Sequence, residues 1–130
     1  MKTASTIARL LLGLLFVVVG VNGFLLFMPP RPTGIPPNAA AFSGAMFASH
    51  YMYVTAGTQV LAGILLLVNR YVPFAIVVLA AVLVNILAFH LTMWPQTLFP
   101  MPVLAVILWF LTAWPLRAHF APLFARTVKV

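Results

Sequence analysis

The residues that could do chemistry in this chain are a few amides, imidazoles and guanidinium groups, because its 130 residues include no Asp, no Glu and no Cys. Six of them lie within or beside long apolar runs: Asn22, Arg31, His50, Gln59, Asn85 and His90. Amides donate and accept hydrogen bonds, and histidine can also carry a proton or bind a metal. These six residues are the predicted ligand-binding set, and the sequence predicts no catalytic residue.

Helical rise places most of this set toward one end of the predicted helices. At about 1.5 Å per residue, Asn22 and Asn85 lie roughly 20 Å from the basic residues at the opposite helix ends. By the same count of about 1.5 Å per residue, Gln59 lies about one turn deeper, and His50 and His90 lie roughly 30 Å along, near a proline-rich loop. We therefore expect amides from three helices to meet beneath the outer face of a membrane, with the imidazoles above them.

Two interpretations of these polar side chains stay open, because polar groups in hydrocarbon turn either toward a pocket or toward each other. In the first, the three amides and His90 line an apolar pocket for a quinone-type or lipid-like head group, and His90 donates a hydrogen bond to a carbonyl oxygen of the ligand. In the second, the amides and Thr55 bond one another across the helix bundle. Asn85 and His90 are five residues apart, about 140° around a helix axis, so they cannot point along one line.

The missing residue types limit the mechanism. Without Asp or Glu, carboxylate proton relays and paired-carboxylate catalysis are excluded. Without Cys, disulfides, thiolate ligands and iron–sulfur clusters are excluded. A metal held by His50 and His90 would lack a carboxylate or thiolate to complete its shell, so no metal site is predicted. The cofactor stays open: a quinone is the first candidate, and a haem with two axial histidines is the weaker one.

Composition assigns the chain to the membrane. It is 65% hydrophobic with a formal charge of +7, whereas a water-soluble domain needs surface charges of both signs. The basic residues stand singly between apolar runs, so nucleic-acid binding, which needs a converging basic surface, is not expected. Anionic lipid head groups are the expected partners of this charge. The basic residues are Lys2, Arg9, Arg31, Arg70, Arg117, Arg126 and Lys129.

Four apolar runs predict four spans in a single domain covering residues 1–130, at about 5–27, 52–68, 73–93 and 102–116. Residues 39–51 are too polar for the centre of a bilayer, so we expect a helix at the interface there, capped by Asn38. A last stretch, 119–126, is expected along the membrane surface. The predicted fold class is all-α: an integral membrane four-helix bundle with an interfacial helix before the second span.

Charge counting orients the predicted spans. With four spans, the two termini and the 69–72 turn share a side that holds six of the seven basic residues, and the opposite loops hold Arg31 alone. Cytoplasmic loops collect Lys and Arg, so both termini are predicted in the cytoplasm. Aromatic residues then lie at both interfaces, with Trp94 near the outer one and Trp114 near the inner one.

Several segments together carry a resemblance to a known family. They are Arg9 to Gly13, Val21 to Phe24, the proline-rich loop, Gln59 to Gly63 with Asn69 to Pro73 after it, and Val84 to His90. In their order, spacing and four-helix layout, residues 8–125 resemble the DoxX-like family of small four-helix membrane proteins.

The resemblance implies a multi-pass protein of the bacterial inner membrane, of a family associated with thiosulfate:quinone oxidoreductase subunits and other membrane redox complexes. Relatives often show a histidine shortly after the Asn-Gly-Phe run, where this chain has Leu26 or Phe27, and this departure argues against a haem or metal held by two histidines. The positions that match the family are Asn22, Gly23, Gln59, Gly63, Asn85 and His90.

Three functions follow as alternatives, all of them fitting a subunit better than a stand-alone enzyme. The first is a redox-associated subunit with a quinone-type or lipid-like ligand pocket near the outer leaflet. The second is a non-catalytic accessory subunit packed in a larger membrane complex or homo-oligomer. The third and weakest is a pathway for a small anion drawn by Arg31.

Overall fold

The computed structural model describes residues 2–29 and 33–128, and every regular element in these two ranges is a helix. The longer helices are α1 (Lys2–Leu25), α2 (Pro37–Ala48), α3 (Tyr51–Leu67), α4 (Val72–Thr92) and α5 (Met101–Ala113). The shorter ones are η1 (Pro95–Thr97), η2 (Trp114–Leu116), α6 (Arg117–Phe120) and η3 (Ala121–Phe124).

Three helical segments are long and apolar enough to cross a membrane: Lys2–Leu25, Val72–Thr92 and Met101–Phe124. The helix α3 passes the same test only together with α2, from which it is bent by 86°. The predicted spans at 52–68 and 73–93 agree with α3 and α4 to within one residue. The predicted fourth span, 102–116, corresponds to α5 and η2 together, and helical structure continues beyond it through α6 and η3 to Phe124.

The first helix begins and ends earlier than the predicted 5–27. Its end is set by Asn22, whose backbone oxygen accepts from the Leu26 amide at 2.9 Å and whose side-chain Oδ1 accepts from the Met28 amide at 2.8 Å. Leu26 has a positive φ of 50°, which turns the chain out of the helix. Polar groups at the end of a helix need hydrogen-bond partners outside it, and these two bonds form before the chain reaches the prolines.

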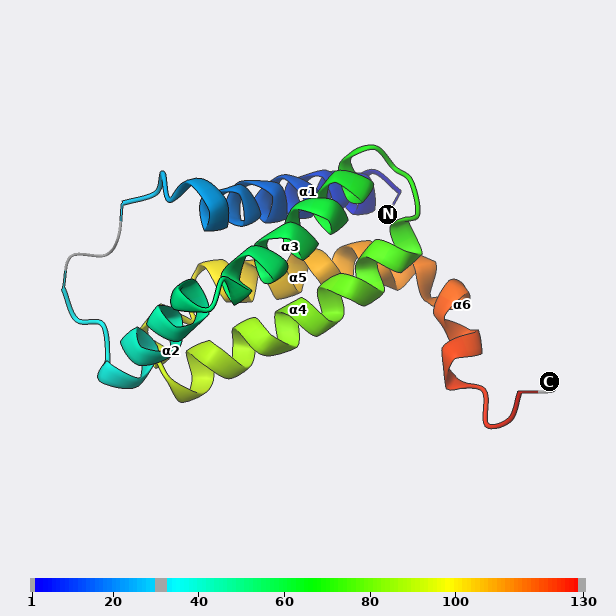
Figure 1. Ribbon diagram of the computed structural model, residues 1–130. Helices are drawn as coiled ribbons and strands as arrows, with labels where there is room; N and C mark the ends of the chain where they lie inside the picture. The colour runs from blue at the N-terminus through cyan, green and yellow to red at the C-terminus, as the bar shows by residue number, and fades with distance from the viewer. Residues whose placement is uncertain (1, 30–32, 129–130) are drawn as a thin grey trace.

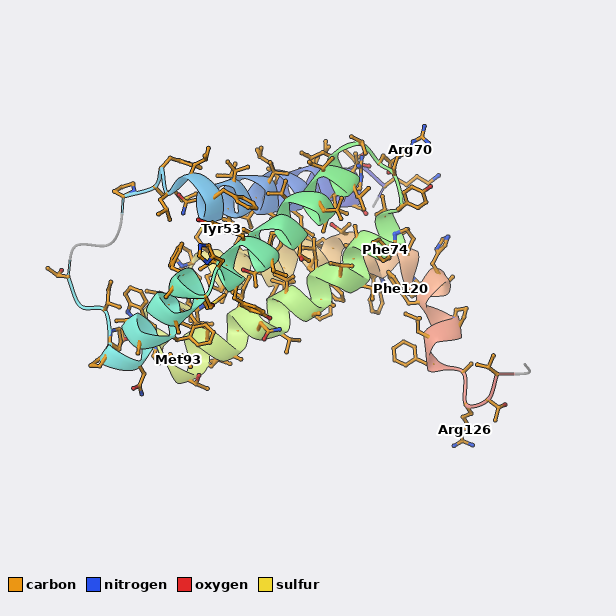
Figure 2. The ribbon with its side chains drawn as sticks, in the orientation of Figure 1. Tyr53, Arg70, Phe74, Met93, Phe120 and Arg126 are labelled. Atoms are coloured by element: carbon orange, nitrogen blue, oxygen red, sulfur yellow. The ribbon has the colours of Figure 1, made fainter. Side chains whose placement is uncertain are left out.

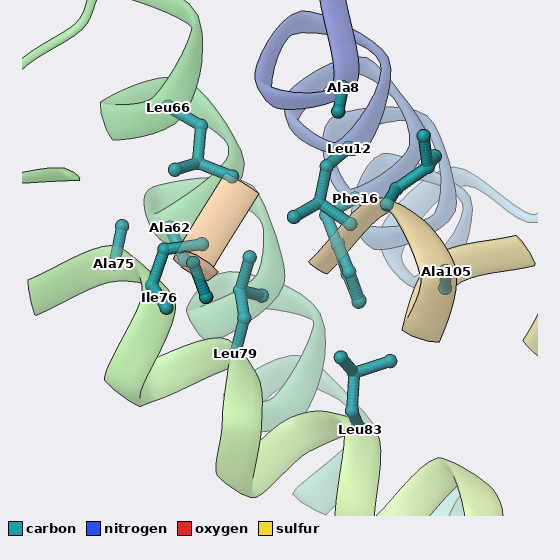
Figure 3. Packing of buried hydrophobic residues seen from close by; sticks show 12 residues of the cluster. Ala8, Leu12, Phe16, Ala62, Leu66, Ala75, Ile76, Leu79, Leu83 and Ala105 are labelled. Carbon is teal, nitrogen blue, oxygen red and sulfur yellow. The ribbon is translucent and has the colours of Figure 1, made fainter. Parts of the chain in front are cut away.

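The four long helices α1, α3, α4 and α5 pack around one core, with α1 against α3 and α5, and α4 against the same two helices (Figure 1). Figure 3 shows the side chains of this core, which come from all four helices. The fully enclosed ones are small or aliphatic, such as Leu12, Leu66, Ile76 and Leu79. Many large apolar side chains instead face outward, a pattern suited to surrounding hydrocarbon.

The closest helix pair is α1 with α3, and glycines make the approach possible. A Cβ added to Gly13 would lie 2.9 Å from the Gly63 carbonyl oxygen, and one added to Gly63 would lie 2.8 Å from the Gly13 oxygen. Gly20 is equally confined, with the Ala56 oxygen 2.8 Å from an added Cβ. Small residues at these positions permit close helix packing, whereas Gly57 has ordinary room.

The helix α2 begins at Pro37, two residues before the start predicted from a cap at Asn38. Its N-cap is Pro36 with Pro37 as the first helical residue, so Asn38 lies inside the first turn and the cap makes no side-chain hydrogen bond. The prediction of Asn38 as the cap is wrong because proline, which lacks an amide hydrogen, suits the first helical position better. The Phe42 ring lies 5.6 Å from that of Phe89 and ties α2 to α4.

Candidate functional site

Asn85 lies on the outer face of α4. The buried residues of this helix are Ala75, Ile76, Leu79 and Leu83. Asn85 is two residues beyond Leu83, about 200° around the axis, so its side chain is exposed. Its Nδ2 donates to the Ala81 carbonyl oxygen at 2.9 Å, one turn back on the same helix. In this position the amide hydrogen-bonds to its own helix.

Asn22 is partly buried at the end of α1, and its Oδ1 is occupied by the Met28 amide described above. Thr55 shows the same local pattern on α3, where its hydroxyl donates to the Met52 carbonyl oxygen at 2.9 Å. The expectation that the amides and Thr55 bond one another across the bundle is therefore wrong for Asn22, Thr55 and Asn85. Each of these side chains finds a backbone partner within six residues of itself.

His90 is partly buried in the last turn of α4, with Nδ1 2.8 Å from the Ile86 carbonyl oxygen. Since a carbonyl oxygen can only accept, Nδ1 carries the proton in the neutral ring, and Nε2 is left as an acceptor. The sequence-based role of His90 as a donor to a ligand carbonyl would need the charged imidazolium. The ring also packs edge-on against Phe89, with centroids 5.2 Å apart.

His50 lies in the bend between α2 and α3, exposed and with a positive φ of 62°. Its ring centroid is 5.6 Å from that of Tyr53, and Tyr53 stacks on Phe24 of α1 at 5.5 Å. These rings join the ends of α1 and α3 near the bend. Arg31, the sixth predicted residue, lies outside the described residues.

Gln59 differs from the other candidates because it lies on the inner face of α3, in line with the buried residues Ala56, Gly63 and Leu66. Within the described residues, its Oε1 is the buried side-chain polar atom that has no hydrogen-bond partner. A buried amide oxygen without a donor is costly, so this atom calls for a water, a ligand or a partner group. Among the predicted site residues that the structure describes, Gln59 is the one with a fully buried acceptor that has no partner.

The predicted site residues also lie at different distances along the bundle axis. The short turn at 68–71 joins α3 to α4, so positions on the two helices can be compared by counting from it. At about 1.5 Å per residue, Gln59 lies roughly 12 Å from this turn and His90 roughly 27 Å. Their separation of about 15 Å along the bundle is too large for one small head group to contact both.

Two polar contacts between helices were not predicted from the sequence. The Trp109 indole nitrogen donates to the Ile76 carbonyl oxygen at 2.9 Å and joins α5 to α4. Arg9 of α1 donates to the Leu66 carbonyl oxygen near the end of α3. The sequence contained a signal for both contacts. A buried indole N–H needs an acceptor, and an arginine within an apolar run needs a polar partner.

Two apolar grooves lie elsewhere on the molecule. One, of about 310 Å³, runs between α1 and α5 beside Leu14, Val18 and Leu104. The other, of about 420 Å³, lies between α4, α5 and the C-terminal helices. Neither groove is lined by a residue of the predicted ligand-binding set. Among the described residues, His, Cys, Asp and Glu form no group of three or more that could hold a metal ion.

Comparison with protein-family models, with characterised proteins and with solved structures found no match for this chain. The DoxX-like resemblance is thus a prediction from the sequence.

Proposed function

We propose that the protein is a DoxX-like, four-span protein of the bacterial inner membrane, with α2 lying along the outer surface and both termini in the cytoplasm. The 86° bend between α2 and α3 supports this layout, since a helix that lies in the membrane plane is perpendicular to one that spans it. The N-terminal end of α1, the α3–α4 turn and the C-terminal helices lie at one end of the bundle (Figure 1), the end that collects the basic residues.

Within that membrane we propose a non-catalytic accessory role, in which the protein packs as a subunit of a larger complex. One observation carries this proposal: Asn22, Asn85 and His90 each make a side-chain hydrogen bond to the backbone of their own segment. Groups held in this way stabilise helix ends and surfaces. The outward apolar faces supply area for contact with neighbouring spans as well as lipid.

The test is the composition of the complex extracted from its native membrane with a mild detergent. A tagged chain expressed at its natural level should co-purify with one other membrane protein at a fixed molar ratio, measured by quantitative mass spectrometry. The ratio should survive a change of detergent. A chain that always emerges alone, as a single copy, would contradict the accessory role.

A second candidate is favoured by the unpaired Gln59 oxygen: binding of a quinone-type ligand that carries a hydroxyl group, such as a reduced quinol. A quinol hydroxyl would donate to Oε1 and remove the cost of the buried acceptor. Solvent extraction of the purified protein should then yield about one quinone per chain, and Gln59→Leu should lose it. Gln96→Leu is the matched control, since Gln96 is exposed in η1. Wild-type protein without extractable quinone would rule this candidate out.

A further inference from the structure

The groove between α4, α5 and the C-terminal helices has an apolar interior. Its walls include Ile76, Val77, Ala80, Trp109, Phe120 and Phe124. The bond from the Trp109 indole to the Ile76 oxygen fixes one side of it, and Phe120 packs against the core. Figure 2 shows Phe120 beside the first turns of α4, while Arg126 projects from the far end of the C-terminal segment. The groove is open along the surface and has a volume of about 420 Å³.

The groove runs from the end of the bundle toward its middle. Ala80 lies eight residues after Val72, the first residue of α4, and therefore about 12 Å along the helix axis. Arg117, at the start of α6, also lines the groove and is exposed. The groove thus has a cationic mouth at the level of the helix ends and an apolar interior that extends into the hydrocarbon layer of the proposed membrane.

The Arg117 guanidinium makes two contacts with Trp114. Its Nη1 donates to the Trp114 carbonyl oxygen at 3.1 Å, and its Cζ lies 5.4 Å from the centre of the Trp114 ring. A guanidinium has five N–H donors in a planar fork that matches a phosphate. The chain contains no Asp or Glu side chain to pair with it, so its charge is complementary to an anion from outside the chain.

We propose that this groove binds one anionic phospholipid from the cytoplasmic leaflet, with the phosphate at Arg117 and an acyl chain along Val77 and Ala80. Phosphates in a bilayer lie at the level of the helix ends and acyl chains run inward from them, which is the order of charge and apolar surface along the groove. The inference depends on the proposed membrane location and is independent of the accessory role.

The experiment is native mass spectrometry of the full-length chain in a non-ionic detergent, after adding back phosphatidylglycerol or phosphatidylcholine with the same acyl chains. Wild-type protein should retain one phosphatidylglycerol and less phosphatidylcholine. Arg117→Gln should lower phosphatidylglycerol retention about fivefold, the effect of one basic residue near an anionic surface, and leave phosphatidylcholine unchanged. Arg126→Gln, which removes a charge outside the groove, should change either value less than twofold.

A second pair of variants tests the apolar interior. Val77 and Val84 are seven residues apart on one exposed face of α4, but only Val77 lines the groove. Val77→Trp should fill it and reduce retention of both lipids, and Val84→Trp should not. All variants should stay in the membrane fraction after alkaline extraction, so that loss of lipid is distinguished from loss of membrane insertion.

Three outcomes would overturn the proposal. One is equal retention of the two lipids by the wild-type protein. Another is an equal effect of Arg117→Gln and Arg126→Gln, which would indicate diffuse attraction by surface charge. The third is a lipid-free dimer that Val77→Trp dissociates, because a second copy of the chain would then cover the groove.

Discussion

At the scale of single residues, Gln59 is the side chain whose environment conflicts with its chemistry. Its Oε1 is buried without a partner on a helix face otherwise lined by Ala56, Gly63 and Leu66. An unsatisfied buried polar group costs about 1–3 kcal/mol. In purified, ligand-free protein, Gln59→Leu should therefore raise the free energy of unfolding by about 1 kcal/mol, measured by circular dichroism during denaturant titration in mixed micelles.

Gln96→Leu provides the comparison for this prediction, because Gln96 is exposed and its replacement should stay within about 0.5 kcal/mol of wild type. A drop in stability for Gln59→Leu would mean that the Gln59 amide already has a donor in the purified protein. That result would place a bound water or ligand beside it.

Arg9 contrasts with Gln59, because it is a charged residue in an apolar helix whose side chain has a hydrogen-bond partner. Its guanidinium donates to the Leu66 carbonyl oxygen and links α1 to the C-terminal end of α3, where positive charge is favourable. Arg9→Met keeps the apolar stem but removes the donor, and should lower the free energy of unfolding by about 1 kcal/mol. Lys2→Met, at an exposed position, should leave the unfolding midpoint unchanged; equal effects of the two variants would argue against a role for the Leu66 contact.

The sequence was informative about which residues are polar and uninformative about where they point. Almost every residue of α4 is apolar, so its pattern has no polar face that would reveal which side is buried. The inward direction of Asn85 could not be tested by periodicity, and the structure places it outside. Gln59 is the exception, because its neighbours at helical spacing include Gly63 and Ala56, small residues of the kind that mark an inner face.

At the scale of helices, the contact between α1 and α3 depends on having no side chain at a few positions. A Cβ at Gly63 would lie 2.8 Å from the Gly13 oxygen and 3.0 Å from the Val17 amide nitrogen, both backbone atoms that cannot move alone. Gly63→Ala should separate the two helices and lower the free energy of unfolding by about 1–3 kcal/mol, as overpacked cores do. Thermal unfolding followed by circular dichroism measures the change.

Gly44→Ala is the matched substitution on α2, where an added Cβ would have no neighbour within 4 Å. Alanine favours the helix over glycine by up to about 1 kcal/mol, so this variant should be as stable as wild type or more so. Two substitutions of the same chemistry are therefore expected to act in opposite directions. A stabilising effect of Gly63→Ala would show that α1 and α3 are less closely packed in the membrane than in the structure.

Helix bounds were predicted better than helix contacts for a physical reason. Proline, glycine and charge interrupt the apolar runs at their ends, and these interruptions fix α3 and α4 to within one residue. Residues after Trp114 are a mixture of aromatic, proline and basic types, so the pattern did not reveal that helix continues to Phe124. The cap at Asn38 was misplaced because two signals, Asn38 and Pro37, compete for adjacent positions.

At the scale of the whole molecule, the number of spans is decided by whether α2 and α3 cross together or return to the same side. Three segments qualify alone, and the bent pair makes a fourth. With four spans, Val68 and Thr127 lie in the cytoplasm, while Thr33 and Gln96 lie outside. If the bent pair re-enters without crossing, Val68 and Thr127 move outside and Gln96 moves inside, whereas Thr33 does not change.

The lack of cysteine makes this choice directly measurable, since each single-cysteine variant carries one thiol in an otherwise thiol-free chain. Thr33→Cys and Gln96→Cys should react with a membrane-impermeant maleimide in intact spheroplasts, and Val68→Cys and Thr127→Cys only after permeabilisation. All four positions are exposed in the structure, so accessibility reports sidedness rather than burial. In the four-span arrangement, six of the seven basic residues lie on the same side of the membrane as Thr127. Because cytoplasmic segments collect Lys and Arg, this arrangement is favoured over three crossings. Labelling of Val68→Cys in intact spheroplasts would make α2 and α3 a re-entrant pair and place the C-terminal groove in the outer leaflet.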